Sequence, residues 1–174
     1  MYPRKGYLQK RALRKQFDPR EYPKETYLLC ELEWRGGIRS WKHWVRNDDV
    51  NDCHAEQYFL EEIFEPRCYN ICDMTWYLSY SPCWDCCDVI RDFLEEHTNV
   101  NIDILVARLY YVNYQKNCLR SLMMNGVAIR IMNLEGNPDT LSKCGLKRYK
   151  GNLPFRPCFK EPANKLPVPA RQPW

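Results

Sequence analysis

Two short motifs, His54-Ala-Glu56 and Pro82-Cys-Trp-Asp-Cys86, constrain the fold of this chain more than any other feature. Together they supply one imidazole, two thiolates and a carboxylate that is not needed as a ligand. Three ligands from His and Cys leave one tetrahedral position of a zinc ion open for water, which distinguishes a catalytic zinc site from a closed structural one. The fold must therefore bring these two separate segments together around one ion.

Both motifs are predicted to lie at helix starts. Cys83 and Cys86, spaced i and i+3, then share one helical face and can present both sulfurs to one ion. The positive end of the helix dipole favours their thiolate forms. We therefore predict one Zn²⁺ per chain with His54, Cys83 and Cys86 as ligands, and Glu56 as the group that moves protons on and off the zinc-bound water.

Other interpretations of these residues stay open from the sequence alone. Cys87 lies about 100° around the helix from Cys86 and is interpreted as a core residue or a support for the ligands, with a ligand role as the alternative. A closed structural zinc site with another Cys or His as fourth ligand would leave Glu56 without a role. Considered alone, His54 would be read as a core histidine, and the Pro-Cys-x-x-Cys motif reverses that reading.

The composition predicts one intracellular domain. At 174 residues the chain suits a single domain with a core of its own. No stretch approaches the ~20 apolar residues that a membrane span requires, so we expect no membrane partner. The N-terminus shows no secretory signal, and ten cysteines are then better explained by metal binding and reduced thiols than by disulfides. The expected location is the cytoplasm, the nucleus or both.

Charge is distributed unevenly along the chain. Residues 1–20 contain seven Lys or Arg against one Asp, and residues 133–174 contain eight basic against three acidic residues. Residues 21–132 contain 11 basic and 18 acidic residues. Basic ends on an acidic body favour a polyanion that is held by flanks and loops. The alternative is that the basic ends serve only solubility or nuclear import.

Hydrophobic periodicity predicts an α/β fold with helices covering a mixed sheet. The chain divides into a basic N-terminal helix within 1–20, a globular domain at 21–132 and a Pro-rich basic tail at 133–174, which is expected to be disordered or loosely docked. Nine elements are expected, in the order helix 4–17, strand 27–34, strand 38–45, helix 53–64, strand 74–80, helix 81–97, strand 102–110, helix 119–125 and strand 127–132.

The chain resembles the AID/APOBEC polynucleotide cytidine deaminases over residues 17–132. The segments that carry the resemblance are Phe17-Asp-Pro-Arg-Glu21, Glu25-Thr-Tyr-Leu-Leu-Cys30, His54-Ala-Glu56, Thr75-Trp-Tyr-Leu-Ser-Tyr-Ser-Pro-Cys-Trp-Asp-Cys86, Val106-Ala-Arg-Leu-Tyr110 and Gly126-Val-Ala-Ile-Arg-Ile-Met132. The first of these, together with Ser81-Pro-Cys-Trp84, is most similar to the branch that edits apolipoprotein B mRNA. The resemblance implies a cytidine-deaminase-like five-stranded sheet flanked by helices, and zinc-dependent hydrolysis of cytosine to uracil in single-stranded RNA or DNA.

The resemblance also implies residue roles around the target base. Thr26 matches a loop threonine beside the base, and Asn47 an asparagine that contacts the flipped nucleotide. Ser81 matches the position whose backbone reads the cytosine edge, and Tyr110 the aromatic that packs on the base.

Three further substrate contacts are expected nearby. Tyr80 stands where the family usually has tryptophan and can still form an aromatic wall. Arg108 is a candidate phosphate contact, with a structural ion pair as the alternative. Tyr111 begins the loop 111–116, which matches the segment that reads the nucleotide 5′ of the target, and it is a candidate stacking residue.

The chain departs from the family pattern after Met132. There the family continues into two helices that cover the sheet, and residues from Leu134 onward match neither, so these helices are expected to be absent. Uncovered apolar sheet surface would destabilise the fold. Two functions follow as hypotheses: a deaminase in mRNA editing, DNA mutation or antiviral defence, which can need an RNA-binding protein for targeting, or a catalytically weak single-strand-binding protein. A third hypothesis, a free-nucleoside or tRNA deaminase, fits the basic ends less well.

Overall fold

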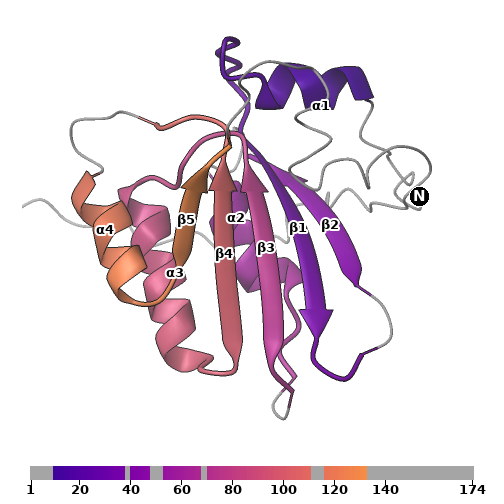
Figure 1. The fold of residues 1–174 in the computed structure, drawn as a ribbon, viewed down its shortest axis with the longest axis vertical. Coiled ribbons are helices and arrows are strands. Elements are labelled where there is room, and N and C mark those ends of the chain that lie inside the picture. The colour runs from indigo at the N-terminus through magenta and orange to yellow at the C-terminus, as the bar shows by residue number, and fades with distance from the viewer. Residues whose placement is uncertain (1–9, 38–39, 48–52, 68–69, 111–115, 133–174) are drawn as a thin grey trace, which may run out of the picture.

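The computed structural model describes residues 10–37, 40–47, 53–67, 70–110 and 116–132. The elements in chain order are α1 (Lys10–Phe17), β1 (Tyr27–Trp34), β2 (Trp41–Arg46), α2 (Ala55–Tyr58), the π-helical segment η1 (Phe59–Ile63), β3 (Cys72–Leu78), α3 (Trp84–Glu96), β4 (Val100–Val106), α4 (Lys116–Met124) and β5 (Ala128–Ile131). Since η1 continues α2 directly, the predicted order of helices and strands is confirmed over the described residues (Figure 1).

The strands form one mixed sheet in the order β2-β1-β3-β4-β5. β1 pairs antiparallel with both β2 and β3, for example Leu29 with Trp44 on one side and with Tyr77 on the other. β3, β4 and β5 run parallel, so each connection between them crosses over through a helix. The predicted five-stranded mixed sheet flanked by helices is therefore confirmed for the part of the chain that the structure describes.

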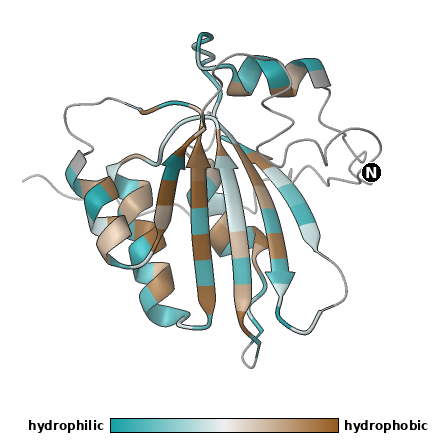
Figure 2. Cartoon of the chain, viewed as in Figure 1, coloured by the Kyte–Doolittle hydropathy of each residue, from teal (hydrophilic) through white to brown (hydrophobic). Residues whose placement is uncertain are grey.

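One face of the sheet carries the main core. Alternate strand residues such as Leu28, Cys30, Trp76 and Ile104 are buried there against α2, η1, α3 and α4, which lie behind the sheet in Figure 1. β3 and β4 each contribute four residues to this core, and much of the β4 ribbon is brown in Figure 2. This helix layer holds both predicted metal motifs on the same side of the sheet.

The opposite face is divided between an apolar end and a charged end. At the end where α1 packs, Leu13 and Phe17 join a second buried cluster with strand residues that include Leu29 and Tyr77. Farther along the strands the face carries ion pairs, namely Lys42 with Glu31, Arg35 with Asp73 and Arg130 with Asp103. Within the described residues, this face therefore carries a buried apolar cluster at one end and ion pairs along the rest of its strands.

Several predicted boundaries shift by a few residues. β3 and β4 each begin and end earlier than predicted, because polar Asp73 and Asn101 hide the true strand starts in the sequence. The helix predicted from Ser81 begins at Trp84 with Cys83 as its N-cap. The helix predicted over 119–125 is already formed at Lys116 and ends before Gly126, whose φ of 88° suits glycine.

Some predictions fall outside the described residues. These are the start of the N-terminal helix, the first residues of the strand predicted over 38–45, and the tail at 133–174 with the question of the two missing helices. Among the helices that the structure describes, none has the length and apolarity needed to cross a membrane.

Candidate metal centre and base pocket

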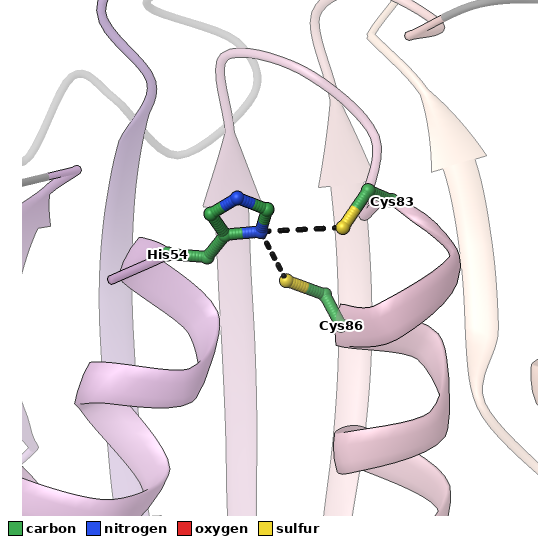
Figure 3. A group of neighbouring side chains, drawn as sticks. All are labelled: His54, Cys83 and Cys86. Carbon is green, nitrogen blue, oxygen red and sulfur yellow. Dashed lines mark hydrogen bonds between the residues drawn. The ribbon is translucent and has the colours of Figure 1, made fainter. Parts of the chain in front are cut away.

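The two metal motifs meet because each places a ligand at a helix N-cap. His54 is the N-cap of α2 and Cys83 the N-cap of α3, and both have extended backbone dihedrals. Because an N-cap residue lies half outside its helix, its side chain can project past the helix end. Cys86 follows in the first turn of α3, and all three side chains point into one small volume (Figure 3).

The three predicted ligands lie close enough to hold one ion. The Nδ1 atom of His54 lies 3.2 Å from the Sγ atom of Cys83 and 3.2 Å from that of Cys86. All three ligand atoms lie within 4.8 Å of one another. With Zn–N and Zn–S bonds of about 2.0–2.1 and 2.3 Å, a tetrahedral zinc ion separates such atoms by roughly 3.5 Å. The donor set and its spacing therefore fit zinc.

Cys87 takes no part in this ligand group. Its side chain is buried in the core of the helix layer, among residues that include Ile90 and Cys118. The interpretation of Cys87 as a core residue is confirmed, since the metal group found among the described residues contains His54, Cys83 and Cys86 alone.

Glu56 lies beside the ligands in a buried position. It is the second residue of α2, and its side chain is 3% exposed. The Sγ atom of Cys86 lies 3.6 Å from its Oε2 atom. Burial raises the pKa of the Glu56 carboxyl, because removal from water disfavours the charged form. A carboxyl with a raised pKa is better suited to accept and return a proton near neutral pH.

The two thiols differ in acidity. A hydrogen bond from Cys86 lowers the pKa of Cys83 to about 5. As the donor in that bond, and because it is also buried, Cys86 has a raised pKa. We therefore expect the pair to lose fewer than two thiol protons when it binds a metal ion.

Asn47 secures the start of α2 from outside the helix. Its Oδ1 atom accepts a hydrogen bond from the backbone N–H of Ala55 at 2.9 Å, whereas the His54 side chain makes no cap hydrogen bond. Asn47 therefore satisfies one of the first N–H groups of α2, which have no partner within the helix, and the His54 ring remains available to the metal site. The backbone N–H of Asn47 donates to the Thr26 carbonyl at 3.0 Å, so the two predicted base contacts are adjacent.

Tyr80, Ser81 and Tyr110 also come together as the resemblance implies. The Tyr80 and Tyr110 rings meet edge to face with centroids 6.1 Å apart. Ser81 links the two loops, because its N–H donates to the Arg108 carbonyl and its Oγ accepts from the Tyr110 N–H. The Tyr80 hydroxyl donates to the Pro23 carbonyl at 2.9 Å. Tyr110 is 42% exposed, so part of its ring is available for contact.

Arg108 contacts the Tyr80 ring from a buried position. It is buried, donates to the carbonyl oxygens of Ser79 at 2.9 Å and Asp18 at 2.5 Å, and lies 4.8 Å from the Tyr80 ring centroid. The Asp18 carboxylate is instead paired with Arg20. The geometry favours a role in holding the Tyr80 wall over either the phosphate contact or the ion pair that the sequence suggested. Tyr111 and the rest of its loop to residue 115 lie outside the described residues.

Comparison with known proteins places this site in a family. The family model described as APOBEC4-like AID/APOBEC deaminase matches residues 16–146. This chain belongs to the AID/APOBEC deaminases. The match continues fourteen residues beyond Met132, farther than the predicted resemblance. The zinc dependence of AID/APOBEC deaminases agrees with the His/Cys/Cys donor set.

Individual relatives are similar over much of the same region. The C→U-editing enzyme APOBEC-1 of Mus musculus is 42% identical over 121 residues, which cover 67% of this chain and 52% of the relative. APOBEC-1 of Homo sapiens is 39% identical over 121 residues, covering 67% and 50%. The DNA dC→dU-editing enzyme APOBEC-3Ca of Felis catus is 38% identical over 120 residues, covering 64% and 57%. The chain therefore matches about half the length of these relatives.

Proposed function

We propose that this chain hydrolyses cytosine to uracil within single-stranded RNA or DNA, with one zinc ion per chain. The observation that carries the proposal is the cluster of His54, Cys83 and Cys86 with the buried Glu56 carboxyl beside it. Three protein ligands and an adjacent proton carrier are what a hydrolytic zinc site requires.

Glu56 supplies the proton transfers of the reaction. His54, Cys83 and Cys86 would hold the zinc ion, which lowers the pKa of a water molecule so that a nucleophile is available at neutral pH. As water adds to C4 of the cytosine, Glu56 would accept one of its protons and pass it to N3. Glu56 would then take the second proton, from the new C4 hydroxyl, and deliver it to the amino group, which leaves as ammonia. The buried position of Glu56 keeps bulk water away from the proton during these steps.

The surrounding residues select and orient the target base. Tyr80 and Tyr110 form two walls at right angles, suited to stacking and edge contact with a flat ring. Thr26 and Asn47 are adjacent, because the backbone N–H of Asn47 donates to the carbonyl of Thr26. Ser81 is held by one hydrogen bond from its backbone N–H and one to its Oγ, and its backbone would read the cytosine edge. Loop 111–116 would contact the base on the 5′ side.

A polynucleotide substrate is supported by charge and by the relatives. Basic residues dominate at 1–20 and 133–174, so both ends can attract phosphates. The relatives are named for C→U editing and for DNA dC→dU editing, and either RNA or DNA is therefore a candidate. An RNA-binding protein would act as a targeting partner, and the reaction would take place in the cytoplasm, the nucleus or both.

The test is uracil formation in an oligonucleotide that contains a single cytosine. With full-length, zinc-loaded protein, we expect uracil in the oligonucleotide and a kcat/KM at least about 100-fold above that for free cytidine, because stacking and phosphate contacts add binding energy. Equal activity on cytidine would contradict a polynucleotide substrate. Salt-sensitive binding to the strand without uracil formation would favour the catalytically weak binding protein instead.

A further inference from the structure

A groove lies between η1 and the C-terminal half of α3, at the far end of the helix pair from the metal centre. Its volume is about 380 Å³. Leu60, Phe64, Val89 and Phe93 supply its apolar floor, and Pro66 and His97 also line it. None of its lining residues belongs to the metal centre or to the base pocket, so the proposed deamination leaves the groove without a role.

The floor of the groove is aromatic and depends on the π-helical turn. The Phe64 N–H donates to the Phe59 carbonyl at 2.9 Å, five residues back, and this ends η1. Phe64 then meets Phe93 edge to face at 5.4 Å, and Phe93 lies 4.5 Å from the His97 ring. Single π turns occur often at functional sites, because they shift side chains out of α-helical register.

The rim of the groove is acidic. Glu61, Asp92 and Glu96 line it from both helices. The surrounding segments 55–67 and 84–97 together contain nine acidic and two basic residues. This surplus of seven equals the acidic surplus of the whole of 21–132, where 18 acidic face 11 basic residues. The negative charge of the body is thus concentrated on the two segments that build the groove, which favours a basic occupant.

We propose that this groove is the docking site for residues 143–156 of the same chain. This segment contains five basic residues and no acidic one, and it interleaves them with Leu146, Tyr149, Leu153 and Phe155. Apolar side chains on the aromatic floor and basic side chains at the acidic rim make the two complementary. The inference is independent of the proposed deamination.

The chain is long enough for this contact. The tail begins near one end of β4, because the N–H of Met132 donates to the carbonyl of Val106, the last residue of that strand. The groove lies near the other end of β4, because its lining residue His97 is three residues before Val100, the first residue of the strand. The seven residues of β4 separate these points by about 23 Å. The ten residues 133–142 span up to roughly 33 Å when extended, which exceeds that separation.

The test combines charge reversal on both sides with hydrogen exchange on the full-length chain. One variant carries three substitutions in the tail, Lys147→Glu, Arg148→Glu and Lys150→Glu. We expect the backbone amides of 59–64 and 92–97 to exchange at least about fivefold faster in this variant than in the wild type. Glu61→Lys with Glu96→Lys should do the same, and the combination of both sets should restore slow exchange, because the charges again attract. Glu62→Lys with Glu95→Lys is the matched control, on the same helices but outside the groove lining, and should leave exchange unchanged.

Carbodiimide coupling between lysines and carboxylates identifies the occupant. The experiment uses an equal mixture of ¹⁴N-labelled and ¹⁵N-labelled chains. If the tail docks on its own chain, each cross-link should join two peptides of the same isotope. The expected cross-links run from Lys147 or Lys150 to Glu61 or Glu96. Mixed-isotope products would make a second copy the occupant and overturn the proposal. Unchanged exchange in the tail variant, with a loss of oligonucleotide affinity, would also overturn it and assign the basic segment to nucleic acid.

Discussion

The helix pair of α2–η1 and α3 has two ends that use the same elements for different purposes. At the N-terminal end, the N-cap residues His54 and Cys83 project side chains past their helices into a shared metal centre. At the C-terminal end, side chains from the flanks of the two helices form an apolar groove with a charged rim. Residues at the helix N-termini can therefore share a metal ion, whereas residues on the helix flanks form the lining of a groove.

The largest expected effect is on the zinc content of the protein, which depends on the metal end of the helix pair. Cys86→Ala removes one of three ligands, so zinc should fall from about one per chain to below about 0.1, and uracil formation should become undetectable. Cys87→Ala is the control, because Cys87 is equally buried but not a ligand. It should keep its zinc and lose only about 1 kcal/mol of unfolding free energy. Equal zinc loss in both variants, measured by elemental analysis, would remove the distinction between them.

Arg108 tests whether the pocket beside the metal end depends on buried support. Arg108→Met removes hydrogen bonds to the Ser79 and Asp18 carbonyls, and we expect a loss of about 2–4 kcal/mol in unfolding free energy with at least a tenfold lower kcat/KM. Arg108→Lys should lie between this variant and the wild type. Arg20→Met, at an exposed side chain, should unfold like the wild type.

A direct phosphate contact by Arg108 would give a different pattern. Arg108→Met would then unfold like the wild type in chemical denaturation, while the salt dependence of oligonucleotide binding would fall by about one unit of slope.

Proton release on zinc binding measures the asymmetry of the two thiols. With the pKa of Cys83 lowered to about 5, this residue is a thiolate at pH 7, and only Cys86 still carries a proton. We therefore expect about one proton released per zinc at pH 7, rather than two. Calorimetric titrations in buffers of different ionisation enthalpy give this number. Release of two protons would mean that the Cys83 thiol is also protonated before zinc binds.

The smallest expected effect comes from the groove end. Glu61→Lys with Glu96→Lys changes exposed charges that are well separated from the metal centre. Zinc content and uracil formation should stay within about twofold of the wild type, because such distant charges are screened by salt. A tenfold change in kcat/KM at physiological ionic strength would show that the two ends of the helix pair are coupled.

The sequence predicts the metal end far better than the groove end. Metal ligands must be particular residue types at fixed spacings, so His54, Glu56, Cys83 and Cys86 were all identified, and the structure brings them together. The mixed sheet with covering helices is also predicted, from the alternation of helices and strands along the second half of the chain. The substrate contacts predicted for Thr26, Asn47 and Ser81 rest on family resemblance and not on the residues alone.

Other features depend on contacts that no local pattern encodes. The π turn at Phe59–Ile63 has the same residue types as an ordinary helix, so the groove that it creates could not be predicted. The sequence suggests a phosphate contact or an ion pair for Arg108, because its burial against Tyr80 arises only when α1, β3 and β4 assemble. The hydrogen bond from the Ala55 N–H to Asn47 likewise forms only when the end of β2 lies beside the start of α2.

The central claim is that Glu56 carries protons for a reaction whose metal is held by other residues. Its most direct test is Glu56→Gln, with zinc content and uracil formation measured on the same preparation. Because the amide keeps the shape of the side chain but cannot carry the proton, uracil formation should fall at least about 100- to 10,000-fold while zinc stays at about one per chain. Activity near the wild-type level with zinc retained would contradict the claim.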